Sequence, residues 1–162
     1  MTEASVSARG TELCATIEVD AAPEDIWPYV TDVAALSRRS PQVLRTVVVP
    51  SPVRLGSWMF NVNHSGWRVW PTTARVVRYE PFEDFAFRMN ENFTIWSYRL
   101  ERTATGTRIV HRRETPQGIS APVRAAIPLV FGGAAAFTAE LLECMAHSLE
   151  ALKDEVESAT AA

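Results

Sequence analysis

The side chains with the clearest chemical potential are His111 and Arg113, which stand two residues apart in GTRIVHRRE. Residues two apart in a strand share a face, so both would lie on the side of Ile109. We expect Ile109 inside, which directs the histidine and the arginine inward, although Val110 leaves the opposite register open. A histidine can transfer protons and an arginine can stabilise negative charge. Both are costly to bury without partners, which makes them candidates for a polar site in an apolar interior.

Aromatic residues on neighbouring segments would surround this pair. In the stretch 93–102, Trp96, Tyr98 and Leu100 share one face, which we expect to point inward. Further residues at strand or helix spacing are expected to line the same interior: Trp58, Phe60, Trp70, Phe85, Phe87, Phe137, Leu141 and Met145. The spacing equally fits ordinary core packing for each aromatic residue, and a cross-strand hydrogen-bonded histidine for His111.

The common catalytic and metal-binding motifs are absent from the sequence. It has three histidines without HxH or HExxH spacing, and no P-loop, GxGxxG or GxSxG motif. Neither Cys14 nor Cys144 has a neighbourhood that marks a nucleophile. We therefore expect no metal and no cofactor, and we interpret Asn61, Asn63 and His64 as turn residues near a hairpin.

Composition and charge limit the class of protein. With 162 residues, 47% of them apolar, the chain is expected to be a single domain, 1–162, with flexible tails at 1–10 and 158–162. A net charge of -3 without a basic run argues against a nucleic-acid partner. The start lacks a signal-peptide core, and the most apolar run, 125–137, is too short and too broken to insert into a membrane. We expect a cytoplasmic protein with reduced cysteines.

The elements that would position these residues follow from hydrophobic periodicity. A strand is predicted at 13–19, a helix from Pro23, and a short helix at 33–39, with Arg38 and Arg39 at its solvated end. Six strands joined by short turns are predicted at 43–49, 56–64, 67–79, 83–89, 93–102 and 107–115. The stretch 134–157 carries an apolar stripe at helical spacing and would form a helix roughly 36 Å long. Only the sheet is broad enough to support this helix.

This order of elements predicts an α+β helix-grip fold, in which a curved antiparallel sheet of about seven strands wraps around the C-terminal helix. The segments AAPEDIWPYVTDVAAL, GSWMF, ARVVRYEPFEDFAF, IWSY, GTRIVHRRETP and AHSLEALK, spread over 13–157, carry a resemblance. In order and spacing the chain resembles the START/Bet v 1-like (SRPBCC) superfamily, especially its polyketide cyclase/dehydrase and aromatase/cyclase branch. The resemblance implies a deep cavity between sheet and helix that holds a hydrophobic molecule.

The resemblance also assigns residues to the cavity. Arg75, which shares a strand face with Thr73, matches a cavity arginine of aromatase/cyclases, and Trp96 matches a cavity tryptophan. His111 stands where that family can have another aromatic residue, which is a departure from its pattern. The alternative for Arg75 and Arg113 is an outer-face ion pair, with Glu101, Glu114 or Asp84 as the partner.

The function implied is binding of an aromatic or polyketide-like molecule, followed by cyclisation and dehydration. Arg75 or Arg113 would stabilise an oxyanion, His111 would move the proton, and Tyr98 would donate a hydrogen bond. The alternative is a non-catalytic carrier or sensor of a lipid or another hydrophobic metabolite. A third interpretation makes 127–137 a homodimer surface, or makes Gly132 and Gly133 the hinge of a lid over the cavity.

Overall fold

The computed structural model describes residues 2–6, 12–116, 118 and 134–160. Eight strands and three helices are assigned within these ranges. The strands are β1 (Glu3–Val6), β2 (Leu13–Val19), β3 (Val43–Val49), β4 (Trp58–Ser65), β5 (Arg68–Glu80), β6 (Asp84–Met89), β7 (Ile95–Arg102) and β8 (Thr107–Glu114). The helices are α1 (Pro23–Thr31), α2 (Val33–Arg39) and α4 (Ala134–Thr160). The region 127–133, predicted as a dimer surface or lid hinge, lies outside the described residues.

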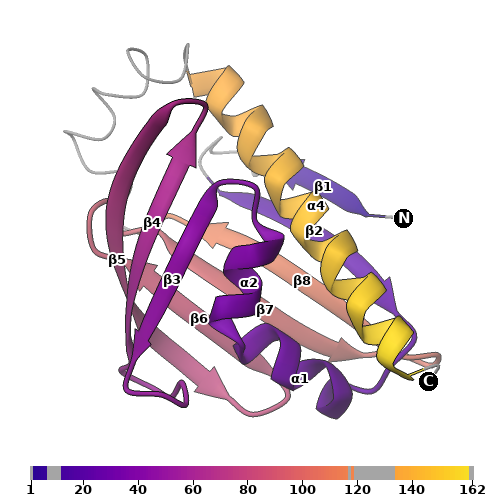
Figure 1. The fold of residues 1–162 in the computed structure, drawn as a ribbon. Coiled ribbons are helices and arrows are strands. Elements are labelled where there is room, and N and C mark those ends of the chain that lie inside the picture. The colour runs from indigo at the N-terminus through magenta and orange to yellow at the C-terminus, as the bar shows by residue number, and fades with distance from the viewer. Residues whose placement is uncertain (1, 7–11, 117, 119–133, 161–162) are drawn as a thin grey trace.

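All eight strands form one antiparallel sheet in the order β1-β2-β8-β7-β6-β5-β4-β3. The six strands from β3 to β8 follow one another as a meander, because short turns join them. The sheet curves around α4, which lies across its concave side (Figure 1). The predicted α+β helix-grip fold is therefore confirmed.

Both ends of the chain are more ordered than predicted. Glu3–Val6, placed in the expected N-terminal tail, forms β1 and pairs with β2 from Glu3↔Thr16 to Val6↔Leu13. The sheet thus has eight strands, and the seven predicted from sequence omit one that is too short to show an alternation. At the other end, α4 continues to Thr160 through residues expected in the C-terminal tail.

The two short helices close one end of the sheet. Pro23 begins α1, and the side chain of Asp32 caps α2 by accepting a hydrogen bond from the Ala35 amide at 3.0 Å. Arg39 is 4% exposed, so the prediction of a solvated helix end is wrong for this residue. It contacts the Glu155 carboxylate of α4 at 2.5 Å and donates to the Tyr29 carbonyl at 3.0 Å. Because α4 packs over the end of α2, the arginine has partners where the sequence suggested solvent.

The predicted apolar stripe of α4 faces the sheet. Its members are buried or half-buried: Phe137, Leu141, Met145, Ser148, Leu149, Leu152 and Val156. Polar contacts fix the C-terminal half against β2, since Lys153 donates to the Glu18 carbonyl at 2.8 Å and Glu157 accepts from the Asp20 amide at 3.0 Å. None of the helices in the described ranges is long and apolar enough to cross a membrane.

Candidate functional site

A cavity of about 360 Å³ lies between the concave side of the sheet, α2 and α4. Pockets that hold small molecules in proteins span roughly 300 to 1,000 Å³, so this one suits a compact ligand. Its sheet side includes Met59, Asn61, Asn63, Trp70, Thr72, Phe87, Met89, Trp96, Tyr98, His111 and Arg113. Its helical side includes Leu36, Ser37, Phe137, Leu141, Cys144, Met145 and Ser148.

The register of β7 and β8 brings four of the predicted site residues to one face. Tyr98 lies opposite His111, and Trp96 lies opposite Arg113. The Tyr98 and His111 rings stack with centroids 4.1 Å apart and planes 8° from parallel. The Arg113 guanidinium carbon is 6.0 Å from the centre of the Trp96 ring, within the range of a cation–π contact. The predicted inward direction of all four side chains is confirmed.

His111 is a neutral imidazole at pH 7. It is 3% exposed, and burial lowers its pKa to about 4. Its Nδ1 lies 3.0 Å from the carbonyl oxygen of Ser97, which can only accept a hydrogen bond. We therefore assign the proton to Nδ1, which leaves Nε2 as a hydrogen-bond or proton acceptor.

Near His111, Arg113 is positively charged and Tyr98 is neutral at pH 7. Burial lowers the pKa of Arg113 to about 10, so the guanidinium remains positively charged at neutral pH although it is 5% exposed. Burial raises the pKa of Tyr98, which keeps its phenol protonated and able to donate. The site thus combines a proton acceptor, a cation and a neutral donor within an apolar lining.

A second polar wall, missed by sequence reasoning, runs across α2, β3, β4 and β5. The Thr46 hydroxyl donates to Asn61 at 2.7 Å and also contacts the Ser37 hydroxyl. Asn63 donates to the Thr72 hydroxyl at 2.8 Å. Asn61 and Asn63 therefore face the cavity, and their interpretation as turn residues is wrong. Their period of two, alternating with Phe60 and Val62, is the signal that could have found this wall.

Nine of the fourteen residues predicted for the site line the cavity. They are Trp70, Phe87, Trp96, Tyr98, His111, Arg113, Phe137, Leu141 and Met145. Phe85 is completely buried, but it packs edge-on against Tyr79 in the core beside the cavity. Thr73 is bonded to Glu91, to which its hydroxyl donates at 2.9 Å. Neither of these two belongs to the lining.

The remaining three predicted residues lie on the outer face of the sheet. Trp58 and Phe60 are 42% and 48% exposed, and Arg75 is exposed beside Trp58. The neighbours of Arg75 along β5, Ala74 and Val76, are almost completely buried and occupy the inner face. The prediction that Arg75, Trp58 and Phe60 point into the cavity is therefore wrong.

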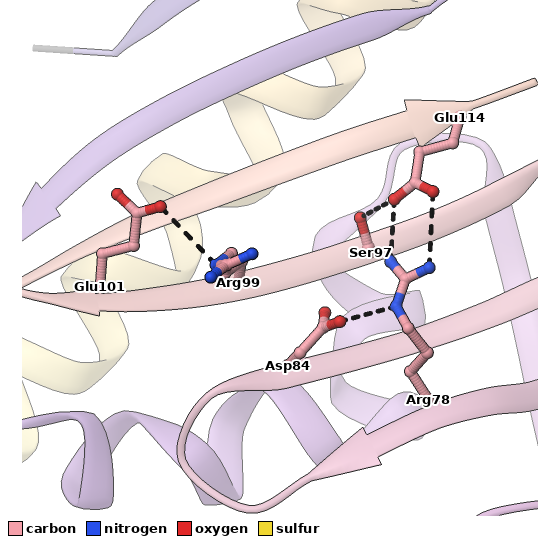
Figure 2. A network of polar contacts seen from close by, with 6 residues as sticks. All are labelled: Arg78, Asp84, Ser97, Arg99, Glu101 and Glu114. Carbon is pink, nitrogen blue, oxygen red and sulfur yellow. Dashed lines mark hydrogen bonds and ion pairs between the residues drawn. The ribbon is translucent and has the colours of Figure 1, made fainter.

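Two of the three predicted acidic partners on the outer face, Asp84 and Glu114, bind a different arginine. Arg78 contacts Asp84 at 2.6 Å and Glu114 at 2.8 Å, as Figure 2 shows. Ser97 also donates to Glu114, at 2.9 Å. Partial burial favours a raised pKa for Glu114, but hydrogen bonds from Arg78 and Ser97 bring it below the ordinary value.

Comparison with known proteins places the chain in a family. Residues 11–157 match the model of the family described as polyketide cyclase / dehydrase and lipid transport. The chain belongs to this family. The resemblance stated from the sequence is thus confirmed over nearly the whole chain. No curated protein matches the chain in a sequence search.

Solved structures share the fold at low sequence identity. The di-domain ARO/CYC StfQ from the steffimycin biosynthetic pathway matches with a TM-score of 0.72 and 15% identity over 94% of this chain. The match covers 52% of StfQ, so the chain spans about half of its length. A Thermus thermophilus protein matches with a TM-score of 0.71 and 15% identity, over 91% of this chain and 98% of its own. A Rhodobacter sphaeroides protein, at 23% identity, gives a TM-score of 0.57 over 91% of this chain and 94% of its own.

The described lining residues offer aromatic, cationic and imidazole groups. Across the part of the chain that the structure describes, no group of three or more His, Cys, Asp or Glu residues could hold a metal ion. Glu91 is the one acid and Arg113 the one arginine among the described lining residues. The arrangement can bind a ligand through aromatic faces, hold an oxyanion at Arg113 and exchange a proton at His111.

Proposed function

We propose that the chain binds an aromatic or polyketide-like hydrophobic molecule in the cavity. The observation that carries this proposal is the set of Trp96, Tyr98, His111 and Arg113 on one inner face of β7 and β8. Flat rings favour a flat ligand, because aromatic surfaces attract through burial and through their quadrupoles. The guanidinium selects a ligand with a carbonyl, phenolate or enolate oxygen at one end.

We further propose that the bound molecule undergoes aldol cyclisation and loss of water. Arg113 stabilises the enolate oxygen formed when His111 Nε2 accepts a proton from the carbon between two carbonyls. The enolate carbon then attacks a second carbonyl of the same chain, and the imidazolium returns its proton to the new alkoxide. In the dehydration, His111 removes the second proton from the same carbon and returns it to the departing hydroxide, which leaves as water.

One observation favours the alternative of a non-catalytic carrier or sensor. An imidazole with a pKa of about 4 is a weak base at neutral pH, which limits proton abstraction. The amides and hydroxyls of the second polar wall are neutral partners that suit a lipid or another hydrophobic metabolite. A negatively charged ligand beside His111 would raise its pKa, so the catalytic interpretation requires an anionic intermediate.

Binding is tested by quenching of intrinsic tryptophan fluorescence. The protein is titrated with a multi-ring hydroxylated aromatic ketone and, separately, with a long-chain fatty acid. We expect saturable binding of the aromatic ketone, weakened roughly tenfold or more in Arg113→Gln, because a charge-assisted hydrogen bond is lost. Arg75→Gln is the matched control, since Arg75 is exposed outside the cavity. Equal weakening by both substitutions would contradict the proposed site.

Catalysis is tested separately with a poly-β-ketone substrate. We expect His111→Gln to retain binding of the aromatic ketone and to lose product formation by roughly a hundredfold or more. Product formation that is unchanged in His111→Gln would contradict the catalytic role of His111, whereas absence of product formation in the wild type would support the carrier. Preference for the fatty acid over the aromatic ketone would support it as well.

A further inference from the structure

The outer face of β3, β4 and β5 exposes a continuous apolar surface. Its members are 39% to 61% exposed: Val47, Val49, Trp58, Phe60, Val62 and Val69. The strand registers place them in adjacent rows, with Val49 opposite Trp58 and Val47 opposite Phe60. Trp67, at the tip of the β4–β5 hairpin, is 87% exposed. We call this surface, with its arginines, the outer β3–β5 face.

Arginines lie on the same face. From residue 33 to residue 79 the sequence contains seven arginines and no aspartate or glutamate, although two of the seven, Arg39 and Arg78, are bound to carboxylates from other parts of the chain. Arg45 lies opposite Val62, and Arg75 lies opposite Trp58. The Arg75 guanidinium carbon is 5.8 Å from the Trp58 ring centre, and that of Arg68 is 5.3 Å from the centre of Trp67. Apolar and cationic groups are thus interleaved.

We propose that the outer β3–β5 face docks on the surface of an anionic lipid bilayer. Tryptophan is favoured at the boundary between lipid headgroups and chains, and anionic headgroups attract arginine. Arginine also buries its aliphatic stem beside apolar groups while its charge stays at the headgroup level. The face lies on the convex side of the sheet, away from α4 (Figure 1).

The β4–β5 hairpin connects the proposed docking face with the cavity on the other side of the sheet. The β4–β5 hairpin carries Trp67 at its tip, while its inner residues Asn63, Trp70 and Thr72 line the cavity. The docking itself depends on the exposed face alone and does not depend on which ligand the cavity takes.

The test is co-flotation of the protein with vesicles, at low and at high salt. One set contains phosphatidylcholine alone, and the other contains phosphatidylcholine and phosphatidylglycerol at roughly two to one. We expect flotation with the anionic set only, reduced by high salt because screening weakens the attraction of arginine to lipid. Arg45→Glu with Arg75→Glu should weaken partitioning roughly 30-fold or more.

Two further variants separate docking from unspecific effects. The control, Arg99→Glu with Arg112→Glu, makes the same change of charge at exposed positions of β7 and β8 and should partition like the wild type. Trp67→Ser alters only a hairpin tip, where folding is not at risk, and should reduce the blue shift of tryptophan fluorescence on binding. Circular dichroism confirms that each variant is folded.

Several outcomes would overturn the proposal. One is that the protein does not float with anionic vesicles at low salt. Another is that the Arg45/Arg75 and Arg99/Arg112 variants lose vesicle binding equally. Dimerisation at all accessible concentrations that is abolished by Trp58→Ser, without flotation, would assign the face to a second copy of the chain. Binding of an acidic amphipathic peptide without flotation would assign it to a protein partner.

Discussion

The two halves of the sheet differ most on their outer faces. In β6, β7 and β8 the inner face carries Phe85, Leu100 and Ile109 beside His111 and Arg113, and the outer face carries Asp84 and Glu114, which bind Arg78 of β5. In β3, β4 and β5 the inner face carries hydrogen-bonded groups such as Asn61, while the outer face exposes Phe60. Both halves alternate with a period of two. Alternation therefore defines two faces, but it does not tell which face is the interior when the interior holds a cavity.

The largest expected effect contrasts one phenylalanine from each half. Phe85→Ala removes a fully buried ring and should lower the free energy of unfolding by about 3 to 5 kcal/mol. Phe60→Ala removes a ring that is 48% exposed and should cost about 1 kcal/mol or less. Urea unfolding followed by circular dichroism measures both. Similar costs for the two substitutions would mean that the outer β3–β5 face is covered in solution.

The second effect concerns the titratable group hidden in the β6–β8 half. The pKa of His111 is about 4 in the folded protein and its ordinary value is 6.5, so the unfolded chain binds a proton first as pH falls. The contribution of His111 to the free energy of unfolding is therefore constant above about pH 6.5 and decreases as pH falls from about 6.5 to 4. At pH 5 the loss attributable to this residue should be about 2 kcal/mol. Urea unfolding at pH 7 and pH 5 measures it.

His111→Gln is the control for this pH dependence. Glutamine has no titratable group, so the variant should lose less stability than the wild type between pH 7 and pH 5, with the difference near the same 2 kcal/mol. His147→Gln, at an exposed position of α4 outside the cavity, provides the matched substitution of a histidine. Identical pH profiles for wild type and His111→Gln would show that the imidazole is not buried as described.

The third effect is that substituting a polar residue of β4 should cost more stability than substituting its apolar neighbour. Asn61→Ala leaves the Thr46 hydroxyl without its acceptor on the inner wall and should cost about 1 to 2 kcal/mol. The next residue along β4, Val62, points outward, and Val62→Thr should change stability by about 0.5 kcal/mol or less. Differential scanning calorimetry at neutral pH compares the two variants. A greater cost for Val62→Thr would place the apolar face of β4 against the interior.

Much of the fold could be predicted because its signals are local. Strand periodicity and short turns located β2 to β8, and the helical stripe from Phe137 to Val156 located the surface of α4 that meets the sheet. The inward direction of His111 and Arg113 could be predicted because they share a strand face with Ile109, an apolar residue expected in the interior. The cavity itself came from a family resemblance, since periodicity does not reveal whether a core contains a void.

The errors arose where the environment of a residue depends on distant segments. Apolar residues usually lie inside, which favours an inward Trp58 and Phe60, but the inner side of β4 belongs to amides that bond to Thr46 and Thr72. Arg39 has an ion pair with Glu155, 116 residues further along the chain, which no local pattern encodes. β1 has only four residues, and its partner strand supplies the backbone hydrogen bonds that make it a strand.

The smallest effect compares two arginines of β5 that both lie outside the cavity. Arg78 is 33% exposed and bridges Asp84 and Glu114, so Arg78→Gln should lower the free energy of unfolding by about 1 kcal/mol, much of the Coulomb energy being screened by solvent. Arg75 belongs to the exposed apolar half, and Arg75→Gln should leave stability unchanged within about 0.5 kcal/mol. Adding salt should narrow the difference, because screening weakens the pairs of Arg78 in the wild type. If urea unfolding gave equal costs for both arginines, the ion pairs of Arg78 would contribute no more to stability than the contacts of Arg75 with Trp58 and the Gly56 carbonyl. The contrast between the two outer faces would then concern binding alone.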